Sequence, residues 1–158
     1  MEDHIRVFCS ASTVPSVRQL LEWSMQQGHR LEIDAHFKDT ALDSPNWTQV
    51  AFSYKESKSS FVCEIDEDSE ADDGLVSEEV AYFEDLLSHI EDSPEKQRVL
   101  QHINITKYIV AAELPFDFDA DGSVALNSLL SYFVRHYDGM VQVDGEGFYE
   151  RGELIVKL

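Results

Sequence analysis

Residues 108–112 read Tyr-Ile-Val-Ala-Ala, an apolar run that no polar, proline or glycine residue interrupts. A short apolar run with β-branched members is typical of a strand in the interior of a sheet. This run therefore predicts a central strand, and the segments on either side of it are interpreted as elements that pack around that strand.

The segment that contains this run, residues 107–158, predicts the order strand, helix, strand, strand. The predicted helix begins at the Gly-Ser pair 122–123, carries apolar residues on one side and ends at Gly139. Residues 5–54 predict the same order, with a helix that ends at Gly28. This likeness has two interpretations, an internal duplication or the ordinary alternation of an α+β protein.

The predicted fold is a single domain over residues 1–158 of the α+β class. We expect a two-layer sandwich with the helices on one face of a mostly antiparallel sheet, an arrangement that resembles ferredoxin-like folds. The two similar segments, 5–54 and 107–158, are joined by an acidic loop and helices within residues 64–103. Folds of this kind carry many unrelated activities, so the fold class does not predict a function.

Size and composition predict a folded protein with an ordinary core. The chain has 158 residues, of which 43% are hydrophobic, enough for a core without a metal or a disulfide framework. The two cysteines, Cys9 and Cys63, lie in apolar strand-like runs and are expected to be buried. The first residues do not form a secretory signal, and no apolar run is long enough to cross a bilayer, so we expect a cytoplasmic protein.

Negative charge is concentrated in the middle of the chain. The formal net charge is −19, and residues 64–92 carry thirteen acidic side chains with no lysine or arginine. Such a field repels nucleic acid and anionic membranes and attracts basic surfaces. The sequence therefore predicts a basic protein surface as partner and excludes direct binding to nucleic acid or membranes.

The acidic stretch has two interpretations. It is either a solvated loop and helix face that keeps the protein soluble, or a docking site for a basic partner, as in immunity proteins and mimics of nucleic acid. The candidate docking residues are Glu64, Asp66, Glu67, Asp68, Glu70, Asp72, Asp73, Glu78, Glu84 and Asp85. A small acidic interaction protein or inhibitor is the function that the sequence favours.

A calcium-binding module is an alternative function. Residues 117–122 read Asp-Phe-Asp-Ala-Asp-Gly, which matches the start of a calcium loop, with Asp117, Asp119 and Asp121 as candidate ligands. The twelfth position, which should be a bidentate glutamate, is Ser128. We therefore expect weak calcium binding at best, and the competing interpretation is an acidic loop that caps the next helix.

An enzyme or small-molecule site is the third possibility. The segment Asp144-Gly145-Glu146-Gly147 places two carboxylates close together, and His136 and Tyr137 precede it. Asp-Gly is also a common hairpin turn, which is the interpretation that we favour. The six histidines are scattered, and no GxSxG, P-loop or GxGxxG motif is present. The sequence thus favours a binding protein over an enzyme and predicts no cofactor.

Overall fold

The computed structural model describes residues 3–68 and 74–158. The strands are β1 (His4–Cys9), β2 (Glu32–Ile33), β3 (Gln49–Ser53), β4 (Phe61–Glu67), β5 (Tyr108–Glu113), β6 (Gly139–Val143), β7 (Gly147–Glu150) and β8 (Glu153–Lys157). The helices are α1 (Val17–Gln26), α2 (Leu75–Ser88), α3 (Pro94–Asn104), α4 (Ala120–His136) and the short 3-10 helix η1 (Ala35–Phe37). Three candidate docking residues, Glu70, Asp72 and Asp73, lie outside the described residues.

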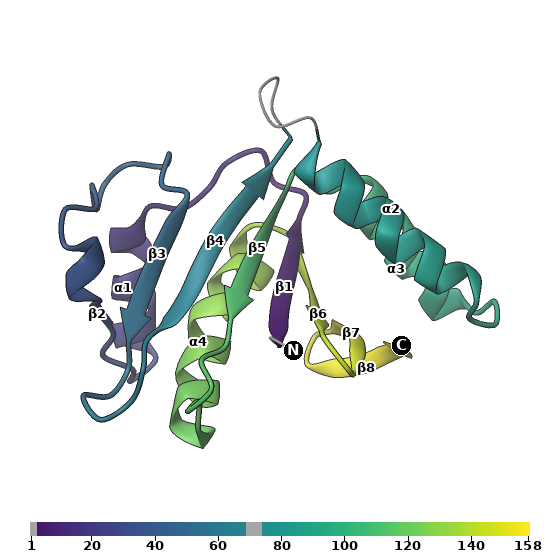
Figure 1. The fold of residues 1–158 in the computed structure, drawn as a ribbon. Helices are drawn as coiled ribbons and strands as arrows, with labels where there is room; N and C mark the ends of the chain where they lie inside the picture. Colours follow the sequence, from purple (N-terminus) through teal and green to yellow (C-terminus); the bar gives the residue numbers. More distant parts are fainter. Residues whose placement is uncertain (1–2, 69–73) are drawn as a thin grey trace.

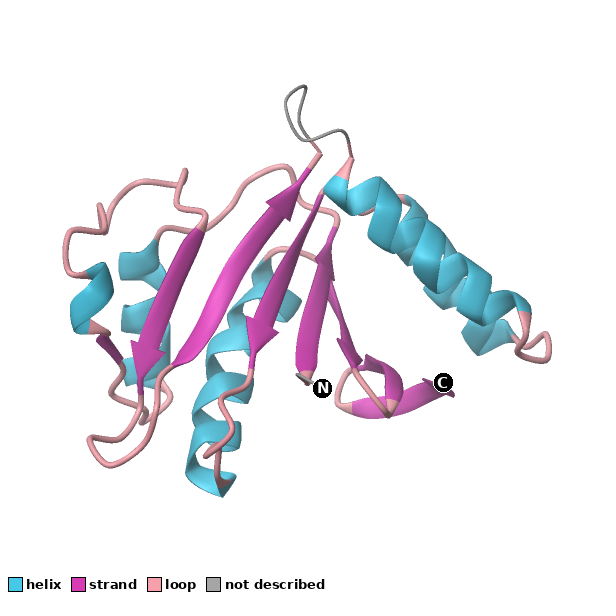
Figure 2. Ribbon diagram, in the orientation of Figure 1, coloured by secondary structure: helices cyan, strands magenta, loops and turns pink. Residues whose placement is uncertain are grey.

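The strands form one eight-stranded sheet in the order β2-β3-β4-β5-β1-β6-β7-β8 (Figure 2). Every neighbouring pair is antiparallel. At its centre β1 pairs with β5 along the full length of both strands, from His4 opposite Glu113 to Cys9 opposite Tyr108. The prediction of an α+β protein with a mostly antiparallel sheet and a central strand over 108–112 is confirmed.

Alternate side chains of the central strands belong to two separate hydrophobic cores. Val7 and Cys9 of β1 pack in a core that includes residues of α1 and α4. Phe8, between them in sequence, packs in a second core with residues of α2 and α3, and so does Ile109 of β5. Because successive side chains of a strand point to opposite faces, the two cores lie on opposite faces of the sheet.

The prediction that all helices lie on one face is therefore wrong. The sequence of β1, Ile5-Arg6-Val7-Phe8-Cys9, places large apolar groups on both faces, and Phe8 and Ile109 need a cover of their own. Phe83 and Leu87 of α2 provide part of that cover. The helices form one layer on each side of the sheet.

The two helix layers cover different halves of the sheet (Figure 1). The core of α1 and α4 takes most of its strand residues from β3, β4, β5 and β1. The core of α2 and α3 takes its strand residues from β5, β1, β6, β7 and β8. In the described part of the chain, the α2–α3 core therefore takes no residue from β3 or β4, although α2 lies next to β4, and the α1–α4 core takes none from β7 or β8.

The sheet is larger than that of a simple ferredoxin-like fold, and that resemblance is not confirmed. Strands β2, β3 and β4 run from the edge of the sheet inward, whereas β6, β7 and β8 run from the centre outward. The likeness between residues 5–54 and 107–158 does not extend to this strand order. The duplication stays a prediction.

Local sequence signals account for the ends of the helices. Ser16 and Gln19 form a capping box at the start of α1, and Ser93 followed by Pro94 starts α3. Asp119 accepts a hydrogen bond from the Gly122 amide at the start of α4. Each cap satisfies an amide that the first helical turn leaves without a backbone partner.

The segment Asp144-Gly145-Glu146 is a turn that joins β6 to β7, as the hairpin interpretation predicted. Gly147, the first residue of β7, has a φ of +143°. A Cβ atom there would lie 2.0 Å from the Val156 carbonyl oxygen. Close pairing of β7 with β8 therefore requires glycine at this position.

We expect the substitution Gly147→Ala to lower the free energy of unfolding by at least about 2 kcal/mol, because the methyl group would separate β7 from β8. Gly145→Ala is the matched control, since Gly145 has a φ of +79° and no atom within 4 Å of the added Cβ. It should cost only about 1 kcal/mol. Urea denaturation of both variants measures the difference, and equal losses would contradict the steric explanation.

Candidate functional site: an acidic face on the sheet

Polar side chains gather on the α2–α3 side of the sheet, next to α2. Arg6 stands opposite Ala111 of β5, and Ala111 stands opposite Glu64 of β4, so the three side chains share one face. The same alternation places further polar side chains beside them. We call this set the acidic face: His4, Arg6, Glu64, Asp66, Glu79, Glu113, Gln142 and Asp144.

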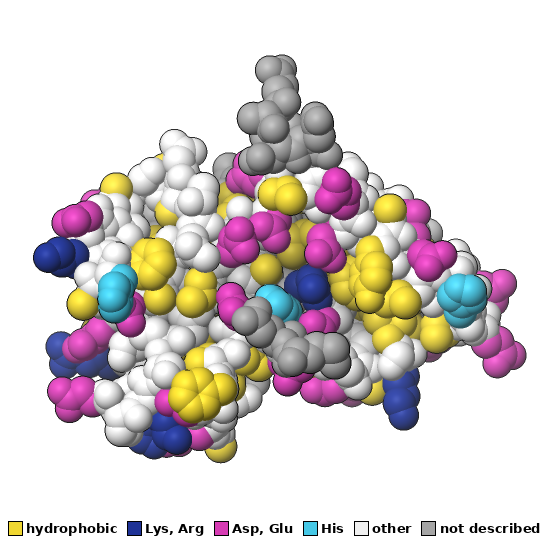
Figure 3. Space-filling model, viewed as in Figure 1, with side chains coloured by type: hydrophobic (Ala, Val, Ile, Leu, Met, Phe, Trp, Pro, Cys, Tyr) yellow, Lys and Arg dark blue, Asp and Glu magenta, His cyan; other side chains and the backbone are white. Residues whose placement is uncertain are grey.

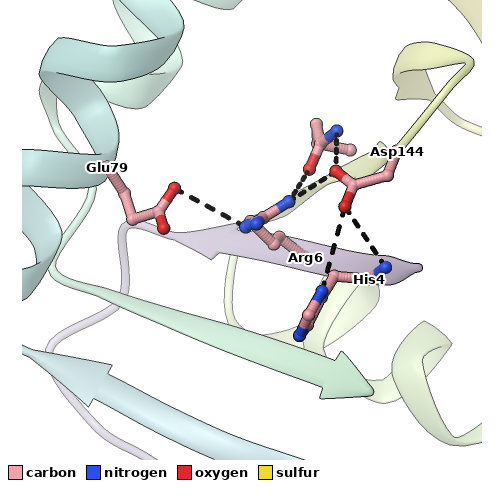
Figure 4. Close-up of polar contacts among 5 residues, drawn as sticks. His4, Arg6, Glu79 and Asp144 are labelled. Atoms are coloured by element: carbon pink, nitrogen blue, oxygen red, sulfur yellow. Dashed lines mark hydrogen bonds and ion pairs between the residues drawn. The ribbon is translucent and has the colours of Figure 1, made fainter. Parts of the chain in front are cut away.

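Arg6 is the centre of the polar contacts on this face (Figure 4). Its Nη1 donates to Asp144 Oδ1 at 2.6 Å and to Gln142 Oε1 at 2.8 Å. Its Nε lies 3.6 Å from Glu79 Oε2 of α2. The guanidinium also lies over the Phe83 ring, 5.4 Å from its centroid. Arg6 thus connects the edge of the second core to the acidic face and is the cation paired with Asp144 and Glu79.

His4 and Gln142 hold Asp144 in place. The His4 backbone amide donates to Asp144 Oδ2 at 3.2 Å, and the Gln142 side-chain amide donates to Asp144 Oδ1 at 3.0 Å. Although partial burial alone would raise it, the pKa of Asp144 is lowered because Gln142, Arg6 and the His4 amide all favour the carboxylate. The charge of Asp144 is therefore largely compensated within the protein.

Asp66 is the acid on this face whose charge is poorly compensated. Burial, together with the nearby carboxylates Glu64 and Glu79, raises its pKa from 3.8 to about 6, in spite of Arg6 and His4. Within residues 3–68 and 74–158, neither Asp66 nor Glu64 has an ion-pair partner. A further cation placed here would relieve the repulsion between these carboxylates.

The space-filling view shows this gathering of charge directly (Figure 3). Acidic side chains surround a basic and a histidine side chain near the middle of the view, beside a hydrophobic area. On α2, Leu75, Glu79 and Tyr82 follow one another at helical spacing and therefore lie on the same side of the helix. The exposed fraction is 57% for Tyr82 and 40% for Leu75.

Of the other candidate docking residues, Asp68 has partners within the protein and Glu67 has an exposed side chain. Asp68 caps α2: its Oδ1 accepts from the Val76 and Ser77 amides at 2.8 and 3.1 Å, and its Oδ2 accepts from the Ser77 hydroxyl at 2.7 Å. These hydrogen bonds lower the pKa of Asp68. Glu67 is exposed at the end of β4. Asp68 thus has a structural role that the sequence interpretation did not anticipate.

The acidic residues of α2 do not all point the same way. Glu84 follows Glu79 by five positions, which places it about 140° away around the helix axis. Glu78 and Asp85 are exposed, and their positions relative to the buried Val76, Phe83 and Leu87 place them on the outer side of α2. Two of the predicted docking residues, Glu64 and Asp66, therefore converge, and they do so with Glu79, which was not among the candidates.

Each carboxylate of the predicted calcium loop has a partner within the protein. Asp119 caps α4, and Asp117 Oδ2 accepts from the Ser59 amide at 3.0 Å. Lys55 Nζ lies 2.9 Å from Asp121 Oδ2 and 3.3 Å from Asp119 Oδ2. A lysine ammonium thus provides the positive charge between two of the three aspartates. Calcium binding at this loop stays a prediction.

The residues predicted for a small-molecule or catalytic site are not brought together. His136 packs on Trp23 and Tyr132 at ring distances of 5.4 and 5.0 Å, near the end of α4. Asp144 belongs to the acidic face on the opposite side of the sheet. Glu146 lies in the β6–β7 turn, where it accepts a hydrogen bond from the Tyr149 hydroxyl. Tyr137 is the C-cap of α4.

In the described part of the chain, no group of three or more His, Cys, Asp or Glu side chains is arranged to hold a metal ion. None of the helices within residues 3–68 and 74–158 combines the length and apolar character required to span a bilayer. Cys9 and Cys63 are free and buried, as expected.

Comparison with known proteins provides no relative: no family model, no curated protein and no solved structure matches this chain.

Arg6 and His4 were not identified from the sequence as members of the acidic face. Arg6 and His4 are polar residues that alternate with Ile5 and Val7 in a strand otherwise made of apolar residues. That alternation indicates a strand with one partly solvent-exposed face, but it does not indicate which acidic residues lie next to Arg6 and His4 on that face. Asp144 was considered only as a turn or catalytic residue, because its pairing with Arg6 depends on the β1–β6 register.

We expect Asp66→Asn to raise the free energy of unfolding by about 1 kcal/mol at about pH 8, after allowing for solvent screening of a half-exposed group. Its raised pKa makes the folded state bind the Asp66 proton more tightly than the unfolded state does. Stability is therefore lost as pH rises from 3.8 to about 6. The benefit of the substitution should disappear near about pH 3.5.

Glu67→Gln is the control for this experiment, because it removes the same charge from the next residue of β4. Urea denaturation at both pH values measures stability, and an NMR titration of the Asp66 carboxyl carbon should show a midpoint near 6. An ordinary midpoint, or an equal gain in the control, would contradict the proposed crowding of carboxylates.

Proposed function

We propose that this protein is an acidic interaction protein that docks its acidic face on the basic surface of another protein. The observation that carries the proposal is the gathering of Glu64, Asp66 and Glu79 on this face, where burial first, and the neighbouring carboxylates after it, raise the pKa of Asp66 to about 6. The repulsion between the carboxylates is a cost in the free protein, and a cationic partner would remove that part of the cost. Binding would therefore gain both the direct ion pairs and the relief of this repulsion.

The position of Arg6 indicates where the partner's charge would lie. Arg6 already pairs with Asp144 and approaches Glu79, so these two acids are partly neutralised within the protein. Glu64 and Asp66 on β4 have no such cation in the described residues. A lysine or arginine of the partner would therefore contact β4, beside α2 on this face of the sheet.

Apolar side chains beside the acids support a protein partner over a simple counter-ion. Tyr82 and Leu75 are exposed on the side of α2 that also carries Glu79. Exposed tyrosine next to charged groups is typical of the residues that contribute most to the affinity of protein interfaces. The partner that fits is a basic surface with an apolar site next to its cations, and occupying that surface would inhibit any protein that uses it.

The overall charge of −19 supports the same function through the kinetics of association. A field of this size accelerates encounter with cationic proteins and opposes approach to nucleic acid and anionic membranes. The protein would act in the manner of an immunity protein or a nucleic-acid mimic. The cytoplasmic location expected from the sequence is part of this proposal.

We expect the triple variant Glu64→Gln/Asp66→Asn/Glu79→Gln to bind a lysine-rich, leucine-containing probe peptide about tenfold more weakly than the wild type. Loss of three ion pairs with the peptide, each worth about 0.5 kcal/mol, accounts for this tenfold loss of affinity. The control variant Glu91→Gln/Glu95→Gln/Glu153→Gln removes the same total charge elsewhere and should bind nearly as well as the wild type. Fluorescence titration of the labelled peptide at about 50 mM salt measures both.

Amide chemical shifts in the wild-type protein locate the contact independently of the variants. Addition of the same peptide should shift resonances of β4, β1 and the first half of α2, and Tyr82→Ala should weaken binding without changing net charge. Equal affinities of the two triple variants, or shifts spread over the whole surface, would show a diffuse counter-ion effect and refute the docking site.

A further inference from the structure

A groove lies on the other side of the sheet, between α4 and the β6–β7 hairpin. Its volume is about 860 Å³, within the usual range of ligand sites. It exists because α1 and α4 do not extend over β7 and β8, so one wall is helix and the other is bare sheet. The groove is distinct from the acidic face, since Val141 and Val143 of its wall alternate with Gln142 and point to the opposite side.

The middle of the groove is apolar. Leu130 and Val134 of α4 form one wall, and Val141 and Val143 of β6 with Ile5 of β1 form the other. Val134, Val141 and Val143 are only partly buried, although they pack against the α1–α4 core. Aliphatic surface that a core leaves partly open is suited to the hydrocarbon part of a ligand.

One end of the groove carries two arginines. Arg135 stands in the last turn of α4, shortly before β6 begins, and Arg151 stands in the β7–β8 turn. β7 runs antiparallel to β6, and Tyr149 lies opposite Val141. The residues that follow Tyr149 therefore lie beside the start of β6. The register therefore brings Arg151 to the end of the groove at which Arg135 lies.

Neither arginine is neutralised by an acid of the described chain. The ion pairs within residues 3–68 and 74–158 include neither Arg135 nor Arg151. The Arg135 guanidinium lies over the Trp23 ring, 5.8 Å from its centroid, which limits its freedom. Arg135 and Arg151, which are both exposed, therefore give one end of the groove two guanidinium groups that have no carboxylate partner in the described residues.

We propose that this groove binds an amphipathic carboxylate, with the carboxylate at Arg135 and Arg151 and the hydrocarbon chain between α4 and β6. The net charge of −19 opposes the approach of any anion, so a bare anion would gain too little from two exposed arginines. The apolar walls provide the additional affinity. Ser123, Asn127 and Glu146 line the other end of the groove, beyond the apolar walls.

Isothermal titration calorimetry of the intact protein with dodecanoate tests this inference. We expect saturable binding with one site, and Arg135→Gln and Arg151→Gln should each raise Kd about tenfold, the usual effect of losing a hydrogen bond to a charged group. Arg30→Gln removes an exposed arginine near β2, far from the groove in the sheet order, and should leave Kd unchanged.

Further measurements distinguish the contribution of the carboxylate to binding from the contribution of the hydrocarbon chain. Dodecanol lacks the charge and should bind at least about tenfold more weakly, and millimolar inorganic phosphate should not displace dodecanoate. Asn127→Trp fills the groove from an exposed position of α4 and should abolish binding while the melting temperature stays unchanged. Equal binding by Asn127→Trp, displacement by phosphate, or no binding of dodecanoate to the wild type would overturn the inference.

Discussion

The pairing of β1 with β5 organises this protein, because the two strands supply side chains to two hydrophobic cores at once. Val7 and Phe8 are neighbours in sequence, yet they pack under different helices. An antiparallel pair of this length fixes which residues of each strand share a face. A shift of register by one residue would exchange the two cores and would place Arg6 among apolar side chains.

A sheet with a core on each face needs two helical layers, and here each layer covers a different half of it. Eight strands are too wide for one pair of helices, so each pair leaves part of its face uncovered. The sheet next to α2 carries Glu64 and Asp66 on β4, whereas the sheet next to α4 carries Val141 and Val143 on β6, which the α1–α4 core covers only in part. Both proposed binding sites follow from this offset.

The two open surfaces differ in chemistry and have different physical consequences. On the acidic face, burial and the neighbouring carboxylates Glu64 and Glu79 both raise the pKa of Asp66, so its charge is held there at a cost in stability. Such a cost is common where a binding surface is prepared for a partner. In the groove, Arg135 and Arg151 oppose the sign of the whole protein, so selectivity there depends on combining charge with apolar contact.

Several features could be predicted from the sequence because they depend on neighbouring residues. The central strand at 108–112, the antiparallel α+β class, the burial of Cys9 and Cys63, and the turn after Asp144 all follow from local pattern. The concentration of acids between residues 64 and 92 also belongs to the sequence. The tertiary structure alone decided which acids converge: Asp68 caps α2, Glu84 points away, and Asp66 lies close enough to Glu79 for their charges to interact. The reason is that charge interactions depend on distances through space, and strand register and helix packing set those distances between residues far apart in the chain.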